Sequence, residues 1–247
     1  MSLKPIQESS LGRAIITPAL TRDQLHVWSA RCPSEARAEL KQILSIDELV
    51  RADRFHFERD RNNFINRRGF LRLILASYLE VAPTAVNFTY NDFGKPNLQD
   101  SARAGMLTFS VSHSREHVRI AVAADKKVGI DVEVVDEKVP IDSIAKTFFS
   151  NTELFTLQRL PDAIKCLGFF SCWTRKEAYV KARGKGLSIP LDSFNVSIQP
   201  GGPPDLIMDS RTAEVWKVDT IERQNGYLVS VAAQGNAWNL ISCTFHL

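Results

Sequence analysis

The chain has 247 residues, of which 44% are hydrophobic and 24% are charged, which indicates a folded protein of one large or two small domains and excludes a largely disordered chain. No stretch is predicted to span a membrane and the N-terminus, MSLKPIQESSLGR, lacks the apolar core of a signal peptide, so we expect a cytoplasmic protein. The net charge is only +3, yet residues 51–72 hold seven arginines and three acidic residues, an excess of +4 that favours an anionic ligand or partner nearby.

The first half of the chain combines one long helix with several strands. Phe64, Leu71, Leu75 and Leu79 recur at helical spacing, and Pro83 ends that pattern. In chain order we predict a strand at 24–30, one or two short helices within 34–50, a helix at 60–79, a strand at 86–90, a turn-rich loop at 91–97, and strands at 106–112 and 117–124.

The second half repeats this mixture without a literal sequence repeat. In chain order we predict a strand at 128–135, helices at 141–149, 151–160 and 169–183, a strand at 194–198, a break at 199–204, and closing strands at 214–220, 227–233 and 238–245. The pattern favours a mixed α/β fold of two halves, 1–126 and 127–247, each with a long helix and a small set of strands.

Two carboxylates stand on the predicted strand GIDVE (Gly129–Glu133). Side chains alternate along a strand, so Asp131 and Glu133 share one face, about 7 Å apart, while Ile130 and Val132 take the other face and the core. Such a pair repels unless a cation lies between its members, and oxygen ligands suit magnesium. A solvated polar strand face is the alternative interpretation.

A helical face carries a further acid and base in WTRKEAYVKARGKG. Trp173, Glu177 and Lys181 are four residues apart and lie on one side of the predicted helix. Glu177 is a candidate third carboxylate for the metal, and Lys181, one turn later, is a candidate phosphate ligand. A surface ion pair within the helix is the alternative.

Two short motifs in the first half offer groups for phosphate. In FSVSHS, adjacent residues face apart and no nucleophile elbow is present, so Ser112 and His113 are more plausible as phosphate ligands than as a nucleophile and its base. In FGKP, Gly94 permits close backbone approach and Pro96 stiffens the turn that presents Lys95 to solvent or an anion. A structural histidine and a plain surface lysine are the alternatives.

Each motif is weak alone, but FGKPN, FSVSHS, GIDVE and WTRKEAYVKARGKGL in this order resemble the surfactin-type 4′-phosphopantetheinyl transferases over residues 45–194. The resemblance implies two similar α/β subdomains related by a pseudo-twofold, with the active site in the cleft between them, in a monomer. It further implies magnesium, with manganese possible as a substitute, bound by Asp131, Glu133 and Glu177.

The same resemblance implies where coenzyme A binds. Lys181 would contact the pyrophosphate, Ser112 and His113 the coenzyme phosphates, and the segment of Lys95 and Pro96 would lie by the coenzyme. Arg51 fits a basic position at the 3′-phosphate. The preceding basic position is Glu48 here, a departure for which Arg54 or Arg67 could compensate.

The implied reaction transfers phosphopantetheine from coenzyme A to a serine of an apo acyl or peptidyl carrier protein and releases 3′,5′-ADP. Glu177, Lys181 and His113 are the candidate catalytic residues, with Glu177 as base. The implied partner has an acidic helix, so we expect docking residues in Phe148–Phe155 and at Lys176, Arg183 and Lys185. Neither nucleic acid nor membrane is expected as a partner. The alternatives are another magnesium-dependent enzyme that cleaves nucleotides or pyrophosphate, and a non-enzymatic anion-binding module.

Overall fold

The computed structural model describes residues 8–10, 15, 17–99, 106–209, 212–224 and 226–246. By the density of internal contacts the chain forms two compact units. Unit 1 comprises residues 1–89, 96–125 and 240–247, and unit 2 comprises residues 90–95 and 126–239. The sequence predicted a single division near residue 126. The chain also passes between the units around residues 90, 96 and 240, so that the loop with Lys95 belongs to unit 2 and the C-terminal strand to unit 1.

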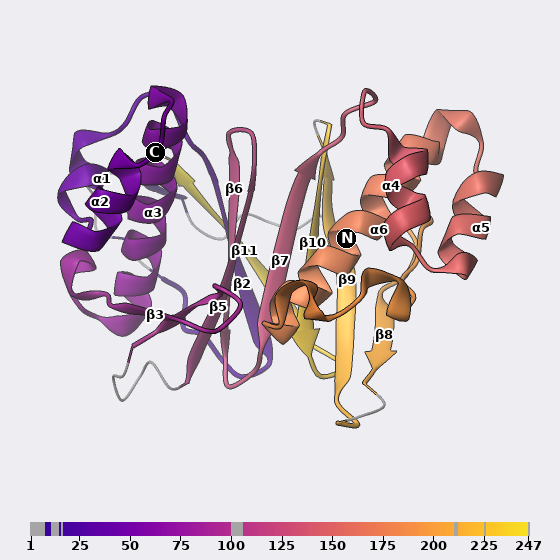
Figure 1. The fold of residues 1–247 in the computed structure, drawn as a ribbon. Coiled ribbons are helices and arrows are strands. Elements are labelled where there is room, and N and C mark those ends of the chain that lie inside the picture. Colours follow the sequence, from indigo (N-terminus) through magenta and orange to yellow (C-terminus); the bar gives the residue numbers. More distant parts are fainter. Residues whose placement is uncertain are drawn as a thin grey trace. The chain divides into compact units, whose positions relative to one another are not determined.

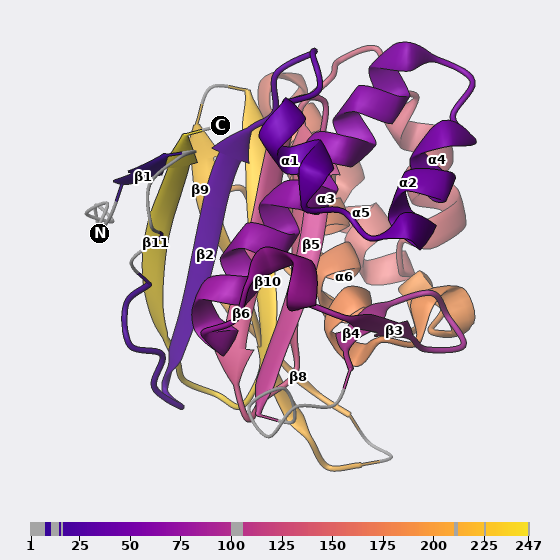
Figure 2. The ribbon, with the colours of Figure 1, turned by 90° about the vertical axis from the view of Figure 1, so that its left-hand side faces the viewer.

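Unit 1 is built on a five-stranded sheet of order β1-β11-β2-β6-β5 (Figure 2). Its strands are β1 (Glu8–Ser10), β2 (Gln24–Arg31), β5 (Leu107–Ser114), β6 (His117–Ala124) and β11 (Asn239–His246). The predicted hairpin of β5 and β6 is confirmed, and β2 also pairs with β6 in the antiparallel sense. Strand β1 pairs in parallel with β11. A two-stranded ribbon, β3 (Phe88–Tyr90) and β4 (Pro96–Leu98), flanks the loop around Lys95.

The helices of unit 1 are α1 (Ala38–Gln42), α2 (Ile46–Asp53) and α3 (Glu58–Leu79), followed by the 3₁₀ turn η1 (Pro83–Ala85). The long helix α3 lies against the sheet, with α1 and α2 beside it (Figure 1). Its apolar face buries Phe70 and Ile74 against Trp28 and Ile120. The ring of Phe70 packs 5.2 Å from that of Phe245, so the C-terminal strand is part of this core. The predicted helix 60–79 is therefore confirmed and begins two residues earlier.

Unit 2 has an antiparallel sheet of order β7-β10-β9-β8. The strands are β7 (Val128–Val134), β8 (Asp205–Met208), β9 (Val215–Gln224) and β10 (Tyr227–Gln234). The helices are α4 (Ile141–Phe148), α5 (Asn151–Arg159) and α6 (Asp162–Arg183), with the 3₁₀ turns η2 (Gly186–Ser188) and η3 (Leu191–Ser193). Helix α6 covers one face of the sheet, and α4 and α5 pack on the far side of α6 (Figure 1).

Helix α6 lies unusually close to β7 because small residues meet there. A Cβ atom on Gly129 would stand 2.1 Å from the carbonyl oxygen of Ala178 and 2.3 Å from the amide nitrogen of Ala182. Only glycine fits at that position, since even one methyl group would overlap helix backbone. Because side chains alternate along a strand, Gly129, Asp131 and Glu133 lie on the same face of β7, and the two acidic side chains are directed to the helix side of the sheet.

Two sequence predictions in unit 2 are wrong. Residues 194–198 form no strand, because carboxylates and not a neighbouring strand bind their amides: Val196 donates to Glu153 (2.8 Å) and Ser197 to Asp205 (3.0 Å). The helix predicted from 169 begins at Asp162. Gly168 interrupts the apolar pattern there, yet its missing side chain makes room for Leu160, whose Cδ1 would lie 2.3 Å from an added Cβ.

Candidate functional site

The predicted acidic pair lies where β7 faces α6. Asp131 is buried, with 2% of its surface exposed, and Glu133 is half-buried. Opposite Asp131 on β10 is Ser230, whose hydroxyl lies 2.8 Å from that of Thr174 on α6. Polar side chains of β10 and α6 therefore lie at this sheet–helix junction together with Asp131.

Helix α6 brings Glu177 and Lys181 to this carboxylate. The ammonium of Lys181 donates to Oδ1 of Asp131 at 2.5 Å, an ion pair between a buried acid and a side chain that is 31% exposed. Burial and the negative charge of Asp131 raise the pKa of Glu177, and Lys181 partly opposes this. The geometry therefore assembles two carboxylates and one ammonium within a single cluster of unit 2.

Lys95 is held on protein backbone. Its Nζ donates to the carbonyl of Lys181 (2.7 Å) in the last turn of α6 and to that of Val128 (3.2 Å) at the start of β7. Burial, with a contribution from the charge of Lys127, lowers the pKa of Lys95 to about 8. The sequence interpretation that the turn presents this side chain to solvent or an anion is wrong in the structure described here.

The remaining predicted ligands are in unit 1. Ser112 and His113 lie near the end of strand β5, where Ser112 is buried and His113 is exposed. Arg51 is exposed on α2, with its guanidinium carbon 5.4 Å from the centre of the Phe64 ring. Pro96 begins β4 and is half-buried.

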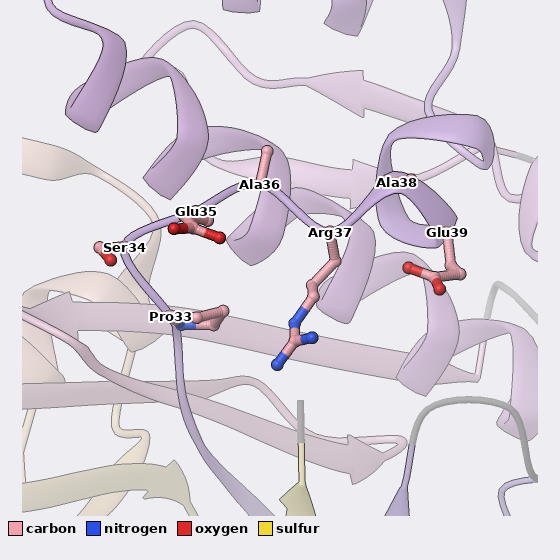
Figure 3. A pocket seen from close by; sticks show the side chains of 7 residues that line it. All are labelled: Pro33, Ser34, Glu35, Ala36, Arg37, Ala38 and Glu39. Atoms are coloured by element: carbon pink, nitrogen blue, oxygen red, sulfur yellow. The ribbon is translucent and has the colours of Figure 1, made fainter.

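Unit 1 contains a cavity of about 450 Å³ between the segment that follows β2, helix α3 and the β5–β6 hairpin. It brings His113 together with Arg67, one of the two arginines considered as a substitute for a basic residue at position 48. The lining residues are Cys32, Ser34, Arg59, Asp60, Asn63, Arg67, His113, Arg115 and Glu116. A smaller cavity of about 300 Å³ is lined by residues 33–39 and contains none of the predicted ligands (Figure 3).

Glu48 has a structural role that explains its departure from a basic residue. It is buried and forms ion pairs with Arg68 and with Arg72, whose Nε lies 2.6 Å away. It also accepts the amide of Ser45 at 2.9 Å, completing a capping box at the start of α2. Burial disfavours its charge, but the two arginines hold the pKa of Glu48 below its ordinary value. The spacing S-x-x-E in SIDE was the signal for this cap.

Two of the three basic residues predicted to dock a partner are in salt bridges. The side chain of Lys176 is fully buried and its ammonium contacts Glu153 at 2.8 Å. Arg183 pairs with Asp209 at 2.5 Å and donates to the hydroxyl of Tyr179. Lys185 is exposed. The prediction that Lys176 lies on a docking surface is therefore wrong, because the helix turns that residue into the core of unit 2.

Sequence reasoning missed a buried polar network behind the site. Arg175, fully buried on α6, donates to Thr220 at 2.9 Å and to Asp205 at 2.7 Å. Thr220 in turn contacts Ser230, the residue opposite Asp131. An arginine within W-x-x-K-E-A gives no sign of burial, since its partners come from β8 and β9.

The carboxylates of Asp131 and Glu177 suit a hard cation that is also bound by the phosphates of the enzyme's substrate. Within the described part of the chain, no three acidic, histidine or cysteine side chains form a ready-made metal cage. Magnesium does not require one, because it is usually held by one or two carboxylates together with substrate phosphates and water. Asp131 and Glu177, close enough for one charge to raise the other's pKa, supply that number.

Comparison with known proteins gives a consistent result. Residues 127–232 match the family model described as the 4′-phosphopantetheinyl transferase superfamily, and residues 28–125 match the model for the N-terminal part of a 4′-phosphopantetheinyl transferase. No helix in the described ranges is long and apolar enough to cross a membrane.

Individual relatives span most of the chain. The 4′-phosphopantetheinyl transferase HetI of Nostoc is 37% identical over 221 residues, covering 89% of this chain and 91% of the relative. The transferase Sfp of Bacillus subtilis is 28% identical over 200 residues, covering 81% and 86%, and psf-1 of Bacillus pumilus is 30% identical over 176 residues, covering 71% and 72%. Asp131, Glu177 and Lys181 thus form their cluster in a chain that belongs to the 4′-phosphopantetheinyl transferase family.

Proposed function

We propose that this enzyme transfers the 4′-phosphopantetheine group of coenzyme A to a serine of an apo acyl or peptidyl carrier protein and releases 3′,5′-ADP. The observation that carries the proposal is the ion pair of Asp131 with Lys181, together with the nearby carboxylate of Glu177, whose pKa is raised by burial and by the charge of Asp131. Carboxylates alone would repel a pyrophosphate, so this site suits a substrate that arrives with a cation.

The proposed reaction is a phosphoryl transfer. The serine Oγ forms a bond to the β-phosphorus of coenzyme A, while the bond from that phosphorus to the bridging oxygen breaks and 3′,5′-ADP leaves with the electron pair. Glu177 accepts the serine proton, a role that its raised pKa supports because a base works best when its pKa approaches the working pH.

Basic side chains would stabilise the developing charge. The side chain of Lys181 is 31% exposed, so its ammonium can donate a hydrogen bond to a phosphate oxygen while it stays paired with Asp131. His113 is proposed as a second charged or neutral donor to the phosphates, together with the hydroxyl of Ser112. Asp131, Glu133 and Glu177 are the proposed ligands for magnesium, or manganese in its place, which when bound would neutralise and orient the pyrophosphate.

The test is intact mass spectrometry of several apo carriers incubated with the enzyme, coenzyme A and magnesium. We expect each accepted carrier to gain one phosphopantetheine group at its serine. Asp131→Asn and Glu177→Gln should lose activity by orders of magnitude with an unchanged circular dichroism spectrum. Hydrolysis of coenzyme A without a modified carrier would instead identify a nucleotide-cleaving enzyme, and full activity of either variant would exclude its proposed role.

Arg51 and Arg67 are proposed to bind the 3′-phosphate of coenzyme A, and Arg67 lines the same cavity as His113. A ligand that binds only the folded protein stabilises it in proportion to the logarithm of its affinity, and a tenfold difference in affinity is worth about 1.4 kcal/mol. Coenzyme A should therefore raise the melting temperature more than dephospho-coenzyme A does. Arg51→Ala and Arg67→Ala, measured separately, should each narrow that difference, and equal shifts in the wild type would contradict a 3′-phosphate site.

The carrier is proposed to dock on the apolar segment Phe148–Phe155 and on the exposed Lys185. Phe148 and Phe155 are 36% and 59% exposed, an apolar surface that a helix could cover. We expect kcat/KM for the carrier to fall in Phe155→Ala, and its dependence on sodium chloride to weaken in Lys185→Ala. Values that match the wild type in both variants would place the docking surface elsewhere. Because both matched family segments lie in one chain, a monomer is proposed, to be checked by light scattering.

A further inference from the structure

The loop that carries Lys95 is fastened to the two elements that bear the acid–base cluster. Oδ1 of Asn91 accepts the amides of Phe93 (3.0 Å) and Lys95 (2.9 Å), and Gly94 closes the turn with a φ of 78°. Nδ2 of Asn91 donates to the carbonyl of Gly184 at 2.7 Å. The turn is therefore closed by its own hydrogen bonds and attached to the C-terminal cap of α6.

The side chain of Lys95 completes this attachment. Its ammonium joins the carbonyl of Lys181 on α6 to the carbonyl of Val128 on β7. Lys181 is the residue whose side chain binds Asp131, and Val128 lies three residues before Asp131 on the same strand. The ammonium of Lys95 thus contacts the backbone of α6, which carries Lys181, and of β7, which carries Asp131. The two elements already approach each other closely at Gly129.

We infer that Lys95 is a positioning residue, which holds the last turn of α6 and the start of β7 together so that Lys181 and Asp131 keep their geometry, and that its ammonium is not a ligand of coenzyme A. A phosphate ligand would need its donors directed at the substrate, whereas two of the three donors of this ammonium are used by carbonyl oxygens. Burial, which lowers the pKa of Lys95 to about 8, is consistent with an ammonium enclosed by protein.

This inference rests on the proposed function, and its test separates the two. Lys95→Met keeps the length of the side chain and removes the ammonium, and Lys138→Met is the matched control because Lys138 is an exposed lysine of the same unit. The measurements are the dissociation constant for coenzyme A by calorimetry, the melting temperature, and kcat and KM with an accepted carrier.

A positioning role predicts that Lys95→Met lowers kcat by about tenfold to a hundredfold, since small misplacements of reacting groups cost this much. The dissociation constant for coenzyme A should change by less than about twofold, and the melting temperature should fall relative to Lys138→Met. Asn91→Ala removes the bond to Gly184 and the two bonds that close the turn but keeps the ammonium of Lys95, and it should give the same division between kcat and affinity. That second variant decides the matter if Lys95→Met does not fold.

A rise of about tenfold or more in the dissociation constant, with kcat and melting temperature at wild-type values, would overturn the inference and make Lys95 a ligand. That outcome would leave the proposed transfer reaction intact. Absence of transfer by the wild type to any carrier would refute the proposed function, while the binding and melting measurements would still report on Lys95.

Discussion

Removal of the buried ammonium of Lys176 should destabilise the enzyme strongly without affecting the surface that meets a partner. The side chain of Lys176 is 0% exposed and that of Glu153 is 2% exposed, with 2.8 Å between Nζ and Oε2. The same ammonium donates to the carbonyls of Leu191 (2.6 Å) and Phe194 (2.7 Å), so all three of its donors have protein partners.

Lys176→Met would leave the carboxylate of Glu153 buried with neutral partners, namely the amides of Ser150 and Val196 and the thiol of Cys172, and without its counter-ion. Removing one member of a buried ion pair costs about 3–5 kcal/mol, chiefly because the other charge remains without its counter-ion. A chain of this size loses about 2–4 °C of melting temperature per kcal/mol, so the expected decrease is about 6–20 °C.

The assay is thermal and urea unfolding of Lys176→Met, Glu153→Gln and the double variant, with Lys138→Met as the exposed control. The control should lie within about 0.5 kcal/mol of the wild type, and the double variant should lose less than the sum of the single losses. At a temperature where both are folded, Lys176→Met should keep the wild-type dependence of kcat/KM for the carrier on salt. The reasoning fails if Lys176→Met is no less stable than the control.

Three further results are expected. Gly129→Ala should cost about 3 kcal/mol or more in urea unfolding, because the added methyl group would overlap the backbone of Ala178, and a loss below about 1 kcal/mol would contradict the close approach of β7 and α6. Burial lowers the pKa of His26 to about 4 from 6.5, so between these values the unfolded chain binds a proton that the folded chain does not. The free energy of unfolding should therefore fall by about 2 kcal/mol as the pH is lowered from 7 to 5. His26→Gln should lack this pH-dependent component, and a pH profile identical to that of the wild type would disprove the role of His26. The acid limb of kcat/KM should lie above the ordinary glutamate pKa of about 4.3, since burial and Asp131 raise the pKa of Glu177, and a limb at or below that value would argue against Glu177 as the base.

The sequence predicted the elements of the site better than the surroundings of its lysines. Alternation along β7 was enough to put Asp131 and Glu133 on one face, and four-residue spacing along α6 was enough to put Glu177 and Lys181 on one face, because both patterns are local. That these two faces meet was expected only from the family resemblance, and the ion pair of Asp131 with Lys181 confirms it. The burial of Lys95 and Lys176 could not be predicted, since the carbonyl groups that bind them come from segments distant in the sequence.

The errors have the same origin. Residues 194–198 have the composition of a strand, but the carboxylates of Glu153 and Asp205 bind their amides. Glu48 looked like a missing phosphate contact until its arginine partners on α3 were known. Its capping-box spacing was visible, so that one role could have been read from the sequence.

Strand β11 has a consequence for how the protein is made. It lies between β1 and β2 in the sheet of unit 1, where Cys243 and Phe245 are buried in the core, although the rest of that sheet is encoded before residue 125. During synthesis, at about 5–20 residues per second, the ribosome must produce all of unit 2 before β11 emerges. For that interval, about 6 seconds or more, the edge of β2 that pairs with β11 stays unpaired. Unit 2 can therefore complete its sheet first, whereas the sheet and core of unit 1 stay incomplete until β11 is made.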